Sequence, residues 1–120
     1  MSKTYFGFAV ADGMFSGERV ELIRKVVSVE EVREMVAQGV IPALNPAHQS
    51  TISAMHTRFG LNVAIPEKAP MVSLGQGDSL IVMSVRGLPR REGIAEYTEA
   101  EINSATFVFS LWTVGMVTPF

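Results

Sequence analysis

Three arginines between Arg86 and Arg91 make this segment the part of the chain best suited to chemistry. The segment reads Arg-Gly-Leu-Pro-Arg-Arg and follows a strongly apolar stretch, residues 80–85, that predicts a strand. Guanidinium groups on a Gly-Pro loop at the end of a rigid strand are suited to bidentate binding of phosphate. The chain as a whole leans acidic, with a formal net charge of −2, so the cationic loop differs from its background. Taken alone, the loop fits a solvated charged turn equally well.

His48 is the second residue that could take part in chemistry. It lies in the first turn of a predicted helix, where unpaired backbone N–H groups and the helix dipole favour anions. Ser50 and Thr51 add hydroxyl groups to the same turn. A phosphate bound there would meet His48, which could act as a general acid or donate a hydrogen bond. The simpler alternative is a histidine at the edge of an apolar helix stripe.

Phe59 and Arg24 each allow two interpretations. Phe59 could stack on a nucleobase, but its spacing from Met55 favours a place in the core. Arg24 lies on a predicted strand and points to the opposite face from Lys25, as on an ordinary half-solvated strand. His56 has no predicted partner, which indicates a surface or packing role.

The composition excludes several classes of site. The chain has no cysteine, which removes disulfides, thiolate catalysis and cysteine-ligated zinc. Its two histidines lie eight residues apart without an acidic companion, so no metal site and no cofactor are expected. No Ser-His-Asp order, paired-carboxylate pattern or Walker motif is present. The net charge argues against a general DNA or RNA binder, whereas a small anionic ligand fits a few arginines.

Length and hydropathy predict one domain, residues 1–120, that acts as a homo-oligomer. A chain of 120 residues can bury a single core, and its 48% hydrophobic content is high for that size. Surplus apolar surface would be covered between subunits. No apolar run reaches the roughly 20 residues of a membrane span, and the N-terminus lacks a signal-peptide pattern. We therefore expect no membrane partner and a cytoplasmic location.

The residue pattern predicts an α+β fold, with a mixed, mostly antiparallel sheet and two or three helices packed on it. One helix should begin after the N-cap Ser28 and end at Gly39, and a capping box of Thr98 and Glu101 should begin another. Asn45 and Pro46 are the expected cap and first residue of the helix that carries His48. Gly75–Asp78 predicts a hairpin turn. The expected strands are 4–11, 19–27, 61–65, 71–74, 79–86 and 106–117, with a short apolar run at 40–44.

The order of five motifs resembles a superfamily of small viral and bacterial proteins that includes the viral ring nucleases. These anti-CRISPR enzymes destroy cyclic tetra-adenylate. The motifs are Asn45–Thr51, Arg58–Gly60, Gly77–Ser79, Arg86–Arg90 and Tyr97–Ile102, and together with the final strand they are spread over most of the chain from residue 40 onward. Within the superfamily, the chain is most similar to the phage Thoeris anti-defence proteins of the first type, which hold cyclic ADP-ribose isomers without cleaving them.

The resemblance implies a sponge for a cyclic nucleotide immune signal, working in the host cytoplasm during phage infection. It implies that Arg86 and Arg90 bind the pyrophosphate, that Phe59 stacks on adenine and that Asn45, His48 and Thr51 contact ribose or phosphate. It also implies dimers, or hexamers built from dimers, and a second kind of site for cyclic oligonucleotides at a subunit junction. The charge of Arg24 makes this residue the candidate for that second site. The full set of expected ligand-binding residues is Asn45, His48, Thr51, Phe59, Arg86, Gly87, Leu88, Arg90 and Arg91.

Two alternatives stay open at this point. Ring nucleases carry a histidine at the position of His48 and an Arg-Leu-x-Glu-Gly motif after the apolar strand. Here the histidine is present, but residues 86–93 replace the second motif, which favours binding over hydrolysis. In a metal-independent ring nuclease, His48 would protonate the leaving oxygen as a ribose 2′-hydroxyl attacks the phosphate. A third possibility is an interaction module whose apolar strand, Thr106–Val117, docks a host protein.

Overall fold

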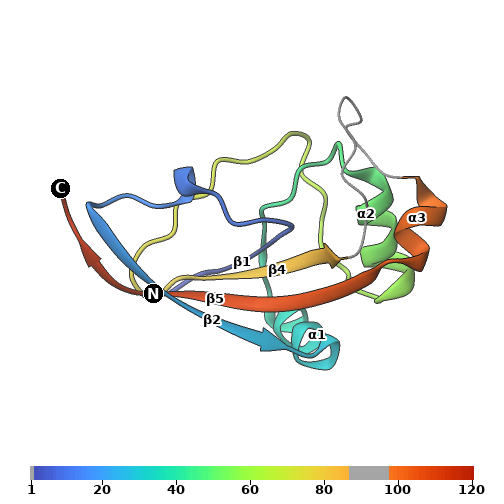
Figure 1. The fold of residues 1–120 in the computed structure, drawn as a ribbon, viewed down its shortest axis with the longest axis horizontal. Coiled ribbons are helices and arrows are strands. Elements are labelled where there is room, and N and C mark those ends of the chain that lie inside the picture. Colours follow the sequence, from blue (N-terminus) through green and yellow to red (C-terminus); the bar gives the residue numbers. More distant parts are fainter. Residues whose placement is uncertain (1, 87–97) are drawn as a thin grey trace.

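A computed structural model describes residues 2–86 and 98–120, and five strands of this part form one mixed sheet (Figure 1). The strands lie in the order β2-β5-β4-β1-β3. Long antiparallel ladders join β5 to β2 and β4, and short parallel ladders join β1 to β4 and β3. The strands are β1 (Thr4–Gly7), β2 (Arg19–Val27), β3 (Ile41–Pro42), β4 (Ser79–Arg86) and β5 (Thr106–Thr118). The predicted α+β class with a mostly antiparallel sheet is confirmed.

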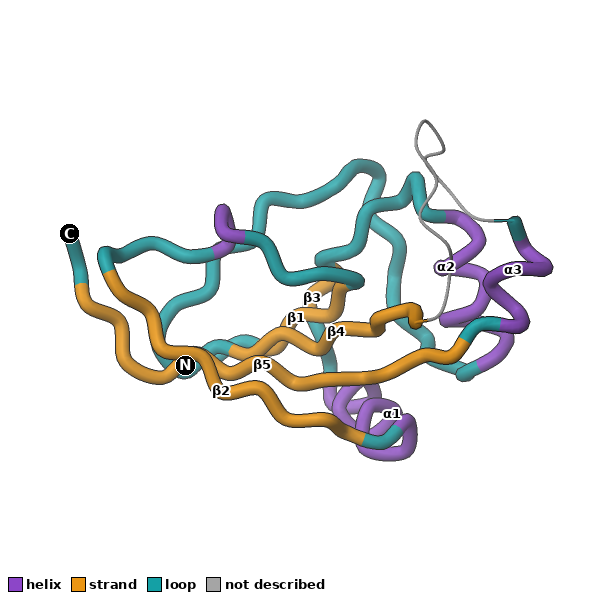
Figure 2. The backbone as a smooth tube through the Cα atoms, viewed as in Figure 1, coloured by secondary structure: helices purple, strands orange, loops and turns teal. Residues whose placement is uncertain are grey.

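Helices lie outside this sheet, and two of them begin at the predicted caps (Figure 2). The Ser28 hydroxyl accepts a hydrogen bond from the Glu31 N–H at 3.2 Å, and Thr98 and Glu101 form a reciprocal capping box. The elements are η1 (Asp12–Met14), α1 (Val29–Gln38), α2 (Gln49–Ser53), the π-helical turn η2 (Ala54–Arg58) and α3 (Glu99–Ser104). Among the described residues, none of these helices is long and apolar enough to cross a membrane.

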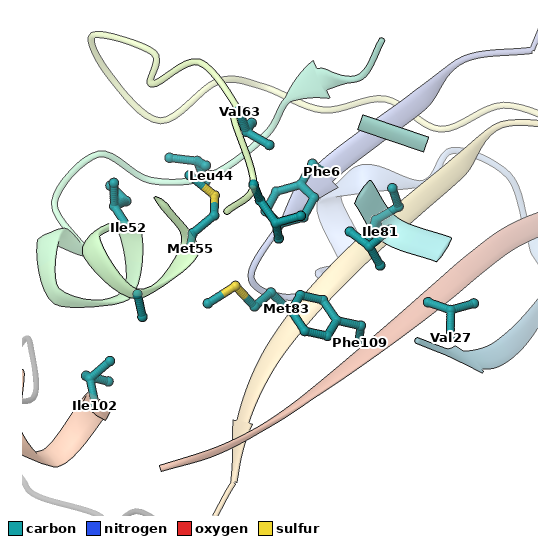
Figure 3. Packing of buried hydrophobic residues seen from close by; sticks show 13 residues of the cluster. Phe6, Val27, Leu44, Ile52, Met55, Val63, Ile81, Met83, Ile102 and Phe109 are labelled. Carbon is teal, nitrogen blue, oxygen red and sulfur yellow. The ribbon is translucent and has the colours of Figure 1, made fainter. Parts of the chain in front are cut away.

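Alternating side chains of the central strands supply two apolar clusters. In β4, Ile81 and Met83 belong to one cluster, and Leu80 and Val82 belong to the other. The first cluster contains Phe6, Phe109 and buried residues of α1, α2, η2 and α3, as Figure 3 shows in part. The second cluster is completed by residues of the connections, among them Val10, Met14, Phe15, Val72 and Leu74. The helices α1, α2, η2 and α3 therefore cover one face of the sheet, and loop segments together with η1 cover much of the other.

The helix that carries His48 begins later than predicted. Its first residue is Gln49, and His48 itself occupies the N-cap position with a non-helical ψ of 64°. The predicted cap Asn45 instead holds a preceding turn, because its Oδ1 accepts a hydrogen bond from the Ala47 N–H at 2.9 Å. The expectation that Asn45 caps the helix and Pro46 begins it was therefore wrong.

Two predicted strands, 61–65 and 71–74, are not strands, and the first strand ends at Gly7 rather than at residue 11. Leu61 and Val63 alternate inward and are buried, but the Leu61 N–H donates to the Met55 carbonyl and Val63 O pairs with His56. Leu74 is also buried, and its N–H donates to Met14 O at 2.7 Å. The period-two pattern therefore reflects side chains that alternate into the core. The backbone groups of these extended segments form hydrogen bonds outside the sheet.

The turn at Gly75–Asp78 is present, but it does not join two strands. The Asp78 carboxylate accepts hydrogen bonds from the backbone N–H groups of Gly75 and Lys3, at 2.9 and 2.8 Å. Gly77 has a φ of 88°, which glycine adopts without strain. The hairpin prediction was wrong because the segment before this turn is a loop. The turn instead fixes the start of β4.

Candidate functional site

Two arginines lie near the point where β4 ends and β5 begins. Arg86 is the last residue of β4 and lies opposite Thr106 in the antiparallel register. The Arg58 guanidinium, at the end of η2, donates through Nη1 to Ala105 O at 2.8 Å and to Ile102 O at 3.4 Å. Both arginines are exposed. The fold therefore brings Arg86 and Arg58 to the same end of the sheet, beside α2 and α3 (Figure 1). Strand alternation puts Arg86 on the face of Leu80 and Val82, whereas the Arg58 guanidinium lies over Phe107 on the other face.

The position of Arg58 follows from helix chemistry. The carbonyls of Ile102 and Ala105 lie at the C-terminal end of α3, where carbonyl groups lack continuing helical partners and the helix dipole favours a cation. The Arg58 guanidinium also lies 5.1 Å from the ring centroid of Phe59 and 5.2 Å from that of Phe107. These contacts hold the guanidinium in a defined place, which is the usual requirement for binding an anion with little ordering cost.

Phe59 belongs to an aromatic cluster. Its ring meets Phe107 and Phe109 edge to face, with centroid distances of 5.2 and 5.1 Å, and it is half-buried. The Arg33 Nε donates to its backbone carbonyl at 2.8 Å. These contacts agree with the core interpretation of the residue. Stacking of Phe59 on a base, which the sequence resemblance implies, stays a prediction.

His48 lies at the other end of the α2–η2 helical segment. It is half-buried, and its ring meets Phe8 edge to face at a centroid distance of 6.4 Å. His48 precedes Phe59 by eleven residues, which at about 1.5 Å of rise per residue places the two roughly 16 Å apart. One phosphate cannot touch both side chains. A ligand that contacts both must be an extended molecule with several polar groups.

Of the remaining predicted ligand-binding residues, some lie in the described part of the chain and some lie outside it. Thr51 is half-buried on α2, and the exposed Asn45 holds the turn before it. The described part of the cationic segment ends at Arg86. The other members of the predicted set, Gly87, Leu88, Arg90 and Arg91, lie outside the described residues.

Arg24, the candidate for a second site, is far from this end of the sheet. It is paired in register with Trp112, six residues beyond Thr106, so about 20 Å separates the two positions along β5. Its guanidinium lies 5.8 Å from the Trp112 ring centroid. The two cationic positions therefore cannot serve the same small ligand in one subunit.

Arg58 was not among the ligand-binding residues predicted from the sequence. Its signal was an arginine next to Phe59 at the end of a predicted helix, but the carbonyls that it binds are more than forty residues away in the chain.

His56, interpreted as a packing residue, places its Nε2 3.1 Å from Val63 O. It also lines a shallow groove of about 510 Å³ along α2 and η2, with Pro46, Gln49, Ile52, Ser53, Thr57 and Ile65. No cluster of three metal-ligating side chains occurs within residues 2–86 and 98–120.

No protein-family model and no curated protein matches this sequence. Among solved structures, the chain is similar to B116 of Sulfolobus turreted icosahedral virus (STIV), with a TM-score of 0.66 and 16% sequence identity. The match covers 93% of this chain and 99% of that one. A viral protein shares this fold. The resemblance to viral proteins is thus supported at the level of architecture, because so low an identity carries the fold alone.

Proposed function

We propose that this chain binds and sequesters a cyclic nucleotide immune signal, such as a cyclic ADP-ribose isomer, without cleaving it. The observation that carries the proposal is that Arg58 and Arg86 lie at the same end of the sheet, where β4 ends and β5 begins, in a chain with a net charge of −2. Two guanidinium groups on rigid elements suit a pyrophosphate, which presents several oxygen acceptors within a short distance. The order of sequence motifs and the fold shared with a viral protein support an anti-defence role in a phage-infected cell.

The strength of binding required of a sponge is within reach of such a site. A trap for a nanomolar signal needs about −12 kcal/mol. Charge-assisted hydrogen bonds contribute about 1.5–3 kcal/mol each, and a stacked base adds about 1–3 kcal/mol. In this proposal Arg86 and Arg90 bind the pyrophosphate, and Arg58 adds positive charge to the same end of the sheet. His48, Thr51 and Asn45 contact the ribose or phosphate groups of the same extended ligand.

The chain is proposed to act as a binder and not as an enzyme. The segment after β4 lacks the Arg-Leu-x-Glu-Gly motif of the ring nucleases, and binding needs no group beyond those named above. We also propose that it works as a homo-oligomer in the host cytoplasm. If the ligand instead emerges linearised, the ring-nuclease alternative with His48 as general acid replaces this one.

Calorimetric titration tests the proposal directly. The protein is titrated with a cyclic ADP-ribose isomer and, separately, with cyclic tri- and tetra-adenylate, and the ligand is then released by heat and examined by chromatography. Tight binding with intact ligand is expected. Linear product would contradict sequestration, and absence of binding by all three ligands would contradict the ligand class.

Site variants test the assignment of residues. Arg86→Ala and Arg90→Ala should each weaken binding at least tenfold, because each removes a charge-assisted contact to phosphate. Lys68→Ala is the matched control, because it removes a cation from an exposed loop outside the predicted ligand-binding set. It should bind the ligand normally. Unchanged affinity in the Arg86→Ala and Arg90→Ala double variant would remove the assignment, even if the wild-type chain binds the ligand.

A further inference from the structure

β2 is an edge strand of the described sheet, with β5 on one side and no strand on the other. It presents two large apolar side chains to solvent, Ile23 at 65% and Val26 at 57% exposure. Between Val20 and Leu22 the partner strand β5 advances by three residues while β2 advances by two, so β5 carries the bulge. β2 therefore stays regular along its length. A long regular edge with exposed apolar residues is a template for pairing with another strand.

We propose that β2 pairs antiparallel with β2 of a second copy of this chain, about a two-fold axis through Ile23. In an antiparallel pair of identical edge strands, the axis stands normal to the sheet, so the residue at the centre faces its own copy. Ile23 is the middle residue of Arg19–Val27, so this register pairs the whole strand. It also buries the exposed Ile23 side chain against its copy.

The charges of β2 select this register. With Ile23 at the centre, Glu21 lies opposite Lys25 of the second copy on the same face of the sheet, and the symmetry repeats the pair. Opposite charges in directly facing positions are favourable, whereas like charges are unfavourable. On the other face, Val20 lies opposite the exposed Val26. Within each chain Glu21 already contacts Arg19 at 3.3 Å, an exposed contact that is compatible with a second cation.

Neighbouring registers fail the same test. Moving the centre to Leu22 places Arg19 opposite Lys25, and moving it to Arg24 places that arginine opposite its own copy. Centres at Glu21 or Lys25 likewise set one charge against its copy. The register with the largest overlap thus also brings opposite charges together and no like charges, which is the complementarity expected of a self-interface.

The dimer would leave the two candidate ligand sites apart. The start of β5 lies beside the Val27 end of β2, since Val27 pairs with Phe109. In an antiparallel pair, the Val27 ends of the two copies lie at opposite ends of the interface. Each ligand site is then formed within one chain, and dimerisation and ligand binding fail or succeed separately.

Paired charge reversals test the interface. Sedimentation velocity is measured for the wild type, for Glu21→Lys, for Lys25→Glu and for an equimolar mixture of the two variants. Each variant alone sets like charges opposite each other, and its dimer dissociation constant should rise about tenfold or more. In the mixture, both facing positions again hold opposite charges, so dimers should return. The matched controls Glu67→Lys and Lys68→Glu change the same charges at exposed loop positions outside β2 and α1 and should dimerise like the wild type.

Three results would overturn the proposal. They are a wild-type chain that stays monomeric at high micromolar concentration, single variants with unchanged dimerisation, and a mixture that fails to restore dimers. Ile23→Ser provides a charge-neutral check, since it removes the central apolar contact from a position that is 65% exposed. It should weaken the dimer, and circular dichroism should show that each variant remains folded.

Discussion

In the described part of the chain, Arg58 and Arg24 lie over aromatic rings, and the fold holds them differently. Arg58 lies against the rings of Phe59 and Phe107, with its Nη1 bonded to carbonyls at the end of α3. Arg24 lies on an edge strand over Trp112, at a longer centroid distance of 5.8 Å. The two arginines have the same chemistry, but Arg58 is held in a defined place by its contacts, whereas Arg24 lies on an exposed edge strand. The first suits a small anion, and the second suits an interface between macromolecules.

The largest expected effect comes from removing the aromatic support of the first arginine. Phe59→Ala takes away a half-buried ring that contacts Phe107, Phe109 and the Arg58 guanidinium. We expect a loss of about 3 kcal/mol in the free energy of unfolding, at the lower end of the range for phenylalanine because the ring is not fully buried. Urea denaturation followed by circular dichroism measures it.

Phe59→Leu is the control for this variant, because it keeps apolar volume at the position. It should retain well over half of the lost stability. If Phe59→Ala costs no more than an ordinary surface substitution, about 0.5 kcal/mol, the aromatic cluster does not support this end of the sheet. The contrast with the Arg24 region would then disappear.

Much of this architecture is predictable from local sequence signals. β2 and β4 have the predicted bounds, and α1 and α3 follow the predicted N-caps Ser28 and Thr98, because alternation and capping are encoded by residues close together in the chain. Residues 61–65 and 71–74 show the limit. Their alternation reflects contacts with the core, and whether an extended segment joins a sheet depends on distant partners that no local pattern contains.

The second prediction concerns the Arg58 guanidinium itself. Arg58→Ala removes donors to Ala105 O and Ile102 O and two ring contacts, and we expect a loss of about 2 kcal/mol. Arg58→Lys keeps the charge but not the planar fork, so it should recover only part of the loss. Equal stability of Arg58→Ala and the wild type in urea denaturation would show that the carbonyl contacts contribute nothing to the fold.

The candidate site was less predictable than the fold for a related reason. The sequence indicates Arg86, because a run of arginines follows an apolar strand, and it indicates His48 near a helix start. It does not indicate Arg58, whose carbonyl partners belong to a helix end more than forty residues away. A local pattern also cannot tell that His48 and Phe59 lie at opposite ends of one helical segment. Sites built from several elements require the tertiary structure.

The third prediction concerns Trp112, the ring beneath Arg24. Trp112→Phe removes the indole N–H that donates to the Ser110 hydroxyl at 3.0 Å, and Ser110 is buried. Loss of this donor should cost about 1 kcal/mol, a smaller effect than at Arg58 because a single hydrogen bond to an uncharged group is involved. Thermal unfolding provides the measurement. In the Ser110→Ala background the same substitution should cost less, and an equal cost there would contradict a role for this bond.

The smallest effect is expected at Arg24. Arg24→Ala removes an exposed cation–π contact, and such contacts contribute about 0.5 kcal/mol at solvent-accessible positions. Urea denaturation at low protein concentration isolates this term from any association of β2 edges. A loss comparable to that of Arg58→Ala would mean that the edge strand holds its cation as firmly as the helix end does. Arg24 would then be a preorganised binding group as well. The difference between the end of the sheet near Arg58, which suits a ligand, and the β2 edge, which suits an interface, would no longer hold.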